Sequence, residues 1–382
     1  MRYFYAVCSL IFVFNFRFLG IQSFTSRRLF IFGLFLLLMH QVLRVLQGRK
    51  WLVNRCIFSV LIISLPAVLI ILSSLFQRFE FSRSLLLLGA ALVFCVILLM
   101  LYENYRPDFD DWFSAVAFVY WCFSLSILLE MSSQLDTGIS SLRDAEVGGV
   151  NYLFNHYVVL SIVYIWFLFV QSRPLVYAVL VVSAILIISS LSRQNFGAFL
   201  VAVLLLFLVY GKNRLLVLVS SGSVLTIVLS LFSDRFVLLF RLLDRIQSLQ
   251  DKGSSGRLDQ FRFAWSLFSD NAWFGVGLGG FSDKAVGILP HVAPESSYNQ
   301  ALAEGGLFGL IVILVFFATA IISLLSSINK ESKVLILTLA LSLGLLFLFN
   351  ELLLDALGIS FILSVLYFSL KRRSPLKRTL GY

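Results

Sequence analysis

Long apolar runs fill this chain, and a soluble fold of its length has no interior large enough to bury them. Hydrophobic residues make up 60% of the 382 residues and charged residues 13%, and the mean hydropathy is +0.96. Soluble domains carry about 45–50% apolar and about 25% charged residues. A bilayer accepts the surplus, and a helix satisfies its own backbone hydrogen bonds within lipid. The sequence therefore predicts an all-α, polytopic integral membrane protein.

The apolar runs divide into about 12 expected spans, because a span needs about 20 apolar residues at 1.5 Å per residue. They lie near residues 3–20, 29–46, 56–76, 84–102, 112–129, 153–171, 175–191, 195–210, 214–232, 301–328, 334–350 and 353–370. The expected organisation is therefore spans over 1–232, one large hydrophilic loop over 233–300, further spans over 301–370 and a basic tail over 371–382. The cysteines lie in or beside apolar runs without metal-binding spacing, so we expect them to pack and expect no metal site.

Basic residues set the expected orientation, because Lys and Arg in short loops gather on the cytoplasmic side. The net charge of +10 falls in short clusters between apolar runs, which is typical of topology signals and argues against nucleic-acid binding. The basic tail after residue 370 places the C-terminus in the cytoplasm. Counting spans backwards places the N-terminus there too, with Arg27 and Arg28 as a local exception. The loop at 233–300 then lies outside, in the periplasm if the cell is Gram-negative.

The large loop contains several patterned stretches. Residues 234–250 place apolar residues at helical spacing, with Arg241 and Arg245 one turn apart. This predicts either an amphipathic helix on the membrane surface or an extension of the preceding span with snorkelling arginines. The sequence GVGLGGF at 275–281 has glycine spacing like that of a dinucleotide loop, but it follows no predicted strand. We therefore expect a tight turn that permits close backbone packing.

A set of motifs in this region resembles the shared signature of the bacterial O-antigen ligase and polymerase superfamily. The set comprises SGR at 255–257, Trp265, GVGLGGF at 275–281, ESSYNQALAEGGLFG at 295–309, and SR at 192–193 followed by Gly197. The resemblance covers roughly 190–310. Ligases of this superfamily typically carry a histidine where Glu295 stands, and ESSY looks more like the repeat-unit polymerases. The resemblance thus favours a polymerase. A ligase stays as the alternative, because His291 restores such a histidine if the alignment is shifted by four residues.

The resemblance implies transfer of a glycan from an undecaprenyl-pyrophosphate donor to an acceptor-sugar hydroxyl, without a cofactor. The leaving pyrophosphate gains negative charge, which fixed cations stabilise. Arginine suits this role because its planar fork binds phosphate oxygens bidentately. Arg193 and Arg257 are the candidates for this clamp, with Arg262 in reserve. The acceptor hydroxyl needs a base within hydrogen-bond reach. Glu295 is the candidate base, and His291 is its rival or an orienting partner.

Further residues have supporting roles in this hypothesis. Tyr298 binds sugar or packs, and Arg241 and Arg245 are additional reserve cations. Glu351 and Asp355 share a helix face, and we expect Asp355 to pair with a loop arginine. Expected partners are the lipid-linked oligosaccharide and membrane lipid, with a chain-length regulator protein as a further candidate and no nucleic acid. A flippase or transporter is the alternative from another class, but it would place charges along a path inside the spans.

Overall fold

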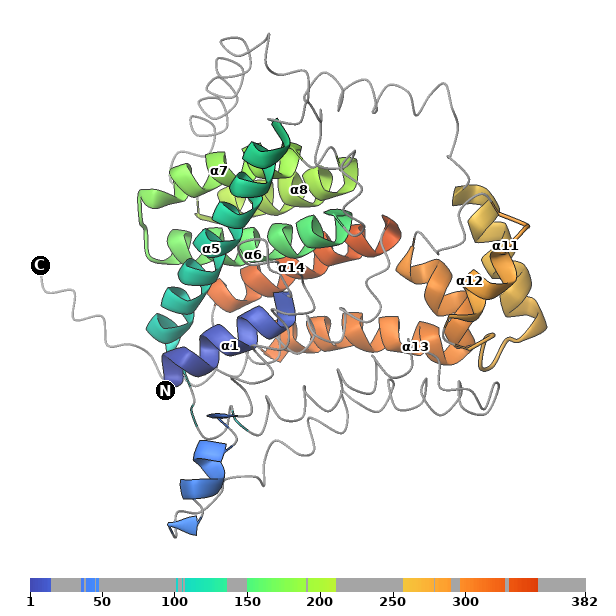
Figure 1. The fold of residues 1–382 in the computed structure, drawn as a ribbon, viewed down its shortest axis with the longest axis horizontal. Helices are drawn as coiled ribbons and strands as arrows, with labels where there is room; N and C mark the ends of the chain where they lie inside the picture. The colour runs from blue at the N-terminus through green and yellow to red at the C-terminus, as the bar shows by residue number, and fades with distance from the viewer. Residues whose placement is uncertain are drawn as a thin grey trace, which may run out of the picture.

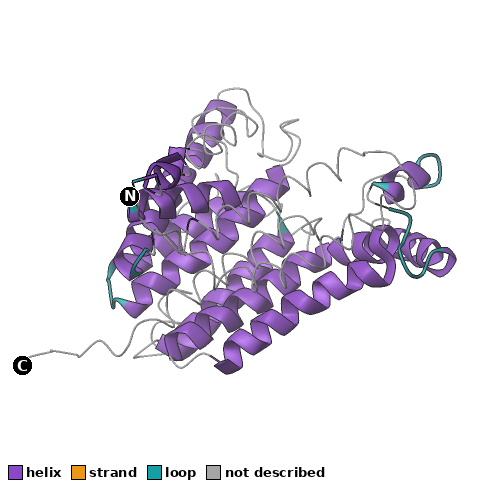
Figure 2. Cartoon of the chain, turned by 90° about the horizontal axis from the view of Figure 1, so that it is seen from below, coloured by secondary structure: helices purple, strands orange, loops and turns teal. Residues whose placement is uncertain are grey.

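The structure is a computed structural model, which describes only part of the chain. The described residues are 1–14, 36–37, 39–44, 46–47, 101, 105, 107–135, 150–189, 192–210, 257–277, 279–289, 296–326 and 330–349. Within these ranges Figure 2 shows helices joined by loops, and no strand. The prediction of an all-helical fold is confirmed for this part of the chain. The described ranges leave the count of about 12 spans untested.

The longer described helices coincide with predicted spans. Their bounds are α1 (Arg2–Phe14), α5 (Phe109–Leu135), α6 (Val150–Val170), α7 (Leu175–Ser189), α8 (Arg193–Tyr210), α13 (Ser297–Ser326) and α14 (Lys330–Phe349). The loop contributes α11 (Arg257–Asp270) and α12 (Gly280–Ala285). The predicted spans near 56–76, 214–232 and 353–370 lie outside the described residues, and of the span near 84–102 only residue 101 is described.

Length and hydropathy support a membrane location for these helices. Among the described residues, Phe109–Leu129 is long and apolar enough to cross a bilayer. Shorter apolar helical segments are Phe154–Val170, Leu175–Ile188, Asn195–Tyr210 and Lys333–Leu346. Many large apolar side chains on these helices face outward, including Leu125, Val181, Leu200 and Leu341. Outward apolar faces beside a buried apolar interior are typical of a bundle surrounded by lipid. The chain is therefore described below as a helical membrane protein.

The bundle has the loop helices at one end. In Figure 1, α6, α7, α8 and α14 lie roughly side by side, α5 crosses them, and α11 and α12 lie at the right-hand end. The most extensive helix contact is between α8 and α14. Here the Ser342 hydroxyl donates to the Ala198 carbonyl at 3.4 Å. With Ser342 beside Ala198, α14 can lie along the full length of α8 only if the two helices run antiparallel. Helix α8 accordingly begins at the end occupied by the loop helices (Figure 1).

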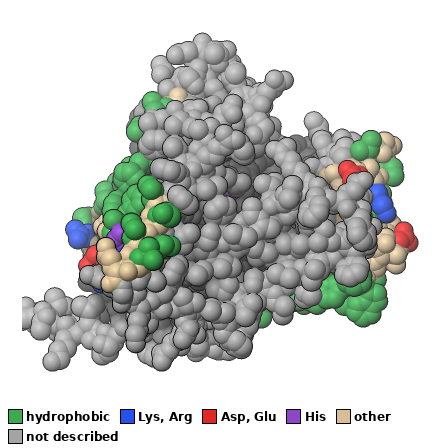
Figure 3. Space-filling view, turned by 60° about the horizontal axis from the view of Figure 1, so that its bottom comes forward, with side chains coloured by type: hydrophobic (Ala, Val, Ile, Leu, Met, Phe, Trp, Pro, Cys, Tyr) green, Lys and Arg blue, Asp and Glu red, His purple; other side chains and the backbone are tan. Residues whose placement is uncertain are grey.

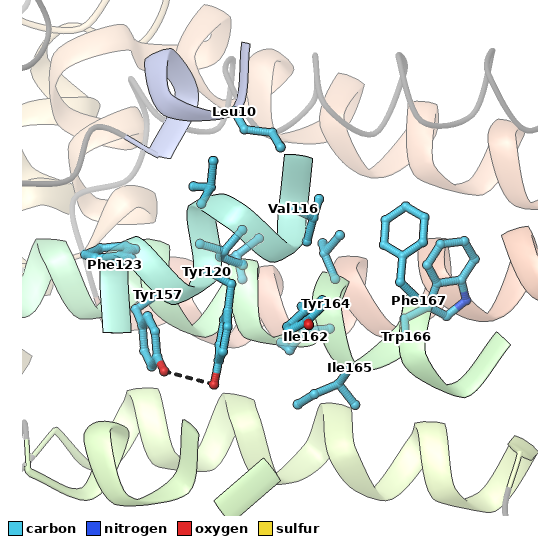
Figure 4. Packing of buried hydrophobic residues seen from close by; sticks show 14 of the residues in the cluster. Leu10, Val116, Tyr120, Phe123, Tyr157, Ile162, Tyr164, Ile165, Trp166 and Phe167 are labelled. Atoms are coloured by element: carbon cyan, nitrogen blue, oxygen red, sulfur yellow. Dashed lines mark hydrogen bonds between the residues drawn. The ribbon is translucent and has the colours of Figure 1, made fainter. Parts of the chain in front are cut away.

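A hydroxyl network lies in the core where α5, α6 and α7 meet. The rings of Tyr120 and Tyr157 stack at 5.7 Å, and the Tyr157 hydroxyl donates to that of Tyr120 at 3.2 Å (Figure 4). The Tyr120 hydroxyl also contacts Ser183 Oγ at 2.8 Å, and Ser124 Oγ contacts the Tyr157 hydroxyl at 2.9 Å. Each hydroxyl thus finds a partner away from water, which fixes the rotation of these helices against one another.

Replacing Tyr120 with Phe should lower the free energy of unfolding by about 1 kcal/mol, because the hydroxyls of Ser183 and Tyr157 lose a partner inside the bundle. Tyr177→Phe is the matched control, since Tyr177 lies on the same group of helices with 53% of its surface exposed. Thermal unfolding of both variants in the same detergent checks this. Equal melting temperatures for the two variants would show that the network adds nothing to stability.

Candidate functional site

The loop helices form a small packed unit with the first turns of α13. Helix α11 turns Gln260, Ala264 and Leu267 inward at helical spacing, and all are buried. Phe281 of α12 and Leu302 of α13 close the same small core, which is separate from the main core of the bundle. The amphipathic pattern of α11 therefore serves packing against α13. We call α11, α12 and residues 296–305 the loop unit.

Helix α13 is broken at Gly306. This residue has φ 56 and ψ −140 within an otherwise helical segment. A side chain there would be strained, because L residues rarely adopt positive φ, whereas glycine does so freely. The predicted span near 301–328 therefore comprises two segments. Residues 297–305 belong to the loop unit, and residues 307–326 continue as a helix into the bundle (Figure 1).

The break in α13 is closed by the turn that follows α11. Backbone amides of residues 276 and 277 donate to carbonyls of 303 and 304, and amides of 307 and 308 donate to carbonyls of 272 and 273. The pairs are Val276 N to Ala303 O at 2.8 Å, Gly277 N to Glu304 O at 3.0 Å, Leu307 N to Ala272 O at 2.8 Å, and Phe308 N to Trp273 O at 3.5 Å. We call residues 272–277 and 303–308 together the glycine clasp. It satisfies backbone groups that the broken helix leaves without helical partners.

Glycines at two positions make this close approach possible. A Cβ on Gly275 would lie 2.5 Å from the Glu304 carbonyl carbon, and a Cβ on Gly306 would lie 2.5 Å from the Gly275 nitrogen. Both glycines also have positive φ, at 66 and 56 degrees. The prediction that GVGLGGF forms a tight turn with close backbone packing is confirmed. Its partner, the glycine pair of the AEGG sequence, was not foreseen.

A buried carboxylate lies inside the clasp, and the sequence analysis did not single it out. Glu304 is 1% exposed, and Gln300 Nε2 donates to its Oε2 at 3.2 Å. Gln260, on the facing surface of α11, is also buried. Burial of a carboxylate is costly unless it is hydrogen-bonded. Its position directly before two glycines within the signature stretch was the available sequence signal.

Tyr298 connects the loop unit to the bundle. It is partly buried and packs against the main hydrophobic core, and its amide donates to Ser296 Oγ at 3.3 Å. Burial raises the pKa of the Tyr298 phenol above its ordinary value of 10.0. The hydroxyl therefore stays protonated at physiological pH and is available as a neutral hydrogen-bond donor or acceptor.

The candidate arginines begin helices at the same end of the molecule. Arg193 is the first residue of α8, and Arg257 is the first residue of α11, one turn before Gln260. Ser192 Oγ accepts the Asn195 amide at 3.5 Å, a weak N-cap that marks the start of α8. A cation at a helix N-terminus is unfavourable for the helix dipole. Helix stability therefore does not explain an arginine at either position.

Arg262 lies in a different environment. Its guanidinium is 3.8 Å from the Asp259 carboxylate, and the two side chains are 71% and 63% exposed. An exposed pair of this kind is screened by water and is worth little. The structure thus places Arg262 on the outer surface of α11, away from the buried face that packs on α13.

Several predicted site residues lie outside the described residues. They are Glu295, His291, Arg241, Arg245 and Asp355. Their roles stay predictions. Among the described residues no group of three or more His, Cys, Asp or Glu side chains is arranged to hold a metal ion.

Replacing Gly306 with Ala should open the clasp, because the new Cβ collides with backbone atoms and the positive φ costs about 1–2 kcal/mol. Gly305→Ala is the matched control, since a Cβ there meets nothing within 4 Å. Hydrogen exchange followed by mass spectrometry is the measurement. Peptides covering 272–277 and 303–308 should exchange severalfold faster in Gly306→Ala and at the natural rate in Gly305→Ala. Unchanged exchange in Gly306→Ala would show that the clasp does not require this glycine.

Comparison with known proteins adds one finding. Residues 178–314 match the sequence model of a family described as O-antigen ligase, and no curated protein matches the chain. The matched stretch runs from α7 to the second segment of α13, so it contains the start of α8, the loop unit and the glycine clasp. The match does not separate polymerases from ligases. Over this stretch it confirms the resemblance of the motifs to the O-antigen ligase and polymerase superfamily.

Proposed function

We propose that this chain is an O-antigen polymerase of the bacterial inner membrane. It transfers a lipid-linked oligosaccharide from undecaprenyl pyrophosphate to the hydroxyl of an acceptor sugar. The observation that carries the proposal is the family match over 178–314, taken together with the structure of that stretch. Its two arginine-headed helices and its loop unit lie at one end of the bundle. The proposed enzyme is a glycosyltransferase that needs no cofactor.

The donor's pyrophosphate determines what the cations must do. Negative charge grows on the leaving phosphate as the glycosidic bond breaks, and preorganised charges at that point lower the barrier. Arg193 and Arg257 supply such charges in this proposal, each beside a helix N-terminus whose free amides add positive potential. Arg262 stays in reserve, because a guanidinium that is 71% exposed contributes less than one shielded from water.

The acceptor hydroxyl must lose its proton as it attacks the donor sugar. Glu295 is the proposed base, and in the sequence it directly precedes Ser296, the residue before α13. Ser296 is buried, so the chain at this point enters the junction of loop unit and bundle. Tyr298 follows within the same turn and is the proposed sugar contact. The proposal requires a partly apolar site around this carboxylate, because desolvation disfavours its charged form and so strengthens it as a base.

The proposed topology places both termini in the cytoplasm and the loop unit in the periplasm. The basic tail after residue 370 supports this topology. Helices α6, α7 and α8 also follow one another through short connections, as expected of consecutive spans that alternate in direction. A lipid-borne pyrophosphate then reaches the site from the outer leaflet. A protein that sets chain length is a proposed partner, recruited at the same face.

An O-antigen ligase is the second candidate; the matched family carries that description, and the match does not separate ligases from polymerases. A ligase would transfer finished polymer to the lipid A core. The residue at 295 speaks for the polymerase, because it is Glu where ligases of the superfamily typically carry His. A flippase receives no support. Among the described residues, Glu304 is the buried acidic side chain, and it belongs to the loop end of the bundle rather than to a path through it.

Each of the variants Arg193→Ala, Arg257→Ala and Glu295→Ala should abolish long glycan chains. The first two remove a cation of the clamp, and the third removes the base. Lys284→Ala is the matched control, because Lys284 is an exposed cation of the same loop without a proposed role. Cells carrying each variant at natural protein levels are compared by lipopolysaccharide gel. A normal ladder from any of the three alanine variants would remove that residue from the site. Arg257→Lys should restore polymer only in part, because lysine keeps the charge without the bidentate fork.

Deleting the chain distinguishes the two candidate activities. Without a polymerase, single repeat units still reach the lipid A core. Without a ligase, the core stays bare and polymer accumulates on the undecaprenyl carrier. The same gel, with an extract of the carrier-linked fraction, reports both outcomes. A bare core with polymer on the carrier would replace the polymerase proposal with the ligase.

A further inference from the structure

The glycine clasp exposes an apolar surface that the proposed reaction does not use. Trp273 is 66% exposed, Phe274 42% and Leu307 40%. In Figure 3 hydrophobic side chains gather at the lower right of the molecule, apart from the charged side chains at the same end. Residues 271–277 contain no charged side chain. We call Trp273, Phe274 and Leu307 the clasp patch.

The second segment of α13 fixes the depth of this patch. Residues 307–326 are 20 helical positions, which extend about 30 Å at 1.5 Å per residue, the thickness of the hydrocarbon core. A helix of this length that spans the bilayer places Leu307 at one boundary. Leu314 and Ala318 follow it at seven and eleven residues, share its helix face and are exposed. This exposed stripe is the lipid-facing side of the helix, and Leu307 forms its outer end.

Backbone hydrogen bonds hold the turn at that same depth. Leu307 N donates to Ala272 O at 2.8 Å, and Phe308 N donates to Trp273 O at 3.5 Å. The Phe274 ring stacks on Phe308 with 5.1 Å between centroids. Trp273 and Phe274 therefore cannot move away from the bilayer boundary unless the clasp opens.

The side chains have the chemistry of a membrane interface. Tryptophan is enriched at the headgroup level, because its ring is apolar and its N–H group forms a hydrogen bond. The exposed surface of α11 differs, since it mixes the charged Asp259, Arg262 and Asp270 with the aromatic Phe261 and Trp265. The turn at 271–277 has no charged side chain and thus continues the exposed apolar stripe of α13. Outer-leaflet phospholipid, rather than a soluble protein, fits the patch.

We propose that the clasp patch is a membrane-interface anchor, with Trp273 and Phe274 inserted among the headgroups and upper acyl chains of the leaflet that the loop unit faces. The anchor holds the loop unit against the bilayer and sets its height. This inference requires only that α13 spans the membrane, and it stands whichever glycan the site transfers.

Spin-label accessibility in lipid nanodiscs tests the anchor. The natural cysteines at positions 8, 56, 95 and 122 are replaced with Ala, and single cysteines carry the label at Trp273, Ser266 or Leu314. Ser266 is the exposed polar control on α11, and Leu314 is the lipid control, 65% exposed on α13. The ratio of collisions with oxygen to collisions with a water-soluble nickel complex should be severalfold higher for the label at 273 than for the label at 266. The ratio at 273 should be lower than the ratio at 314.

Two results would overturn the proposal. A label at 273 with the same nickel accessibility as at 266 would show that the turn lies in water. A label at 273 shielded from both oxygen and nickel would show that protein, such as a second copy of the chain, covers the patch.

A second measurement does not depend on the cysteine variants. The otherwise natural chain and its Trp273→Phe variant are compared in bilayers whose lipids carry bromine near the headgroup end of the acyl chains. Bromine quenches tryptophan on contact, so the substitution should remove part of the quenchable fluorescence. Bromine near the chain ends should quench this part less. An equal quenched signal from both proteins would rule out the anchor.

Discussion

The backbone pairing between the turn at 272–277 and the broken helix at 303–308 determines the arrangement of everything around it. A break in a helix leaves amides and carbonyls without helical partners, and such groups are costly where water is scarce. The turn supplies those partners at 2.8–3.5 Å. As a result α11 folds back onto the first segment of α13, and Glu304 becomes buried between them. The loop unit is thereby attached to the start of a span.

The same pairing relates the loop unit to the proposed chemistry. Arg257 begins the helix that the clasp holds, and Tyr298 lies on the segment that connects the clasp to the main core. Arg193 begins α8, which reaches the same end of the bundle through its packing on α14. A reaction on a lipid-borne pyrophosphate needs cations, a base and the membrane surface within one small region. The clasp and the contact between α8 and α14 bring helices that are far apart in the sequence to one end of the bundle, where the proposed site lies.

Some features of the candidate site could be predicted from the sequence and others could not, for physical reasons. The glycine cluster at 275–281 was interpreted correctly, because glycines without a preceding strand have few uses other than tight turns. Glu304 was missed although two glycines follow it, because its burial against α11 is a contact between segments that are distant in the sequence. Arg262 lies on the exposed side of α11, which periodicity alone did not show, and its role as a reserve cation stays a prediction. Glu295 and His291 lie outside the described residues, and the choice between them stays a prediction.

By itself the sequence determined the class of protein and its family resemblance. Lipid imposes both long apolar runs and helical structure, and the motifs at 192–197 and 255–309 carry the resemblance that the family match over 178–314 supports. Only the tertiary structure decided that α13 is two segments, that two distant glycine groups form one clasp, and that the turn at Trp273 pairs with the start of the second segment. A hydropathy value is averaged over a window of residues, so it cannot detect a single residue with positive φ. Close approach of two backbones depends on partners that sequence order does not bring together.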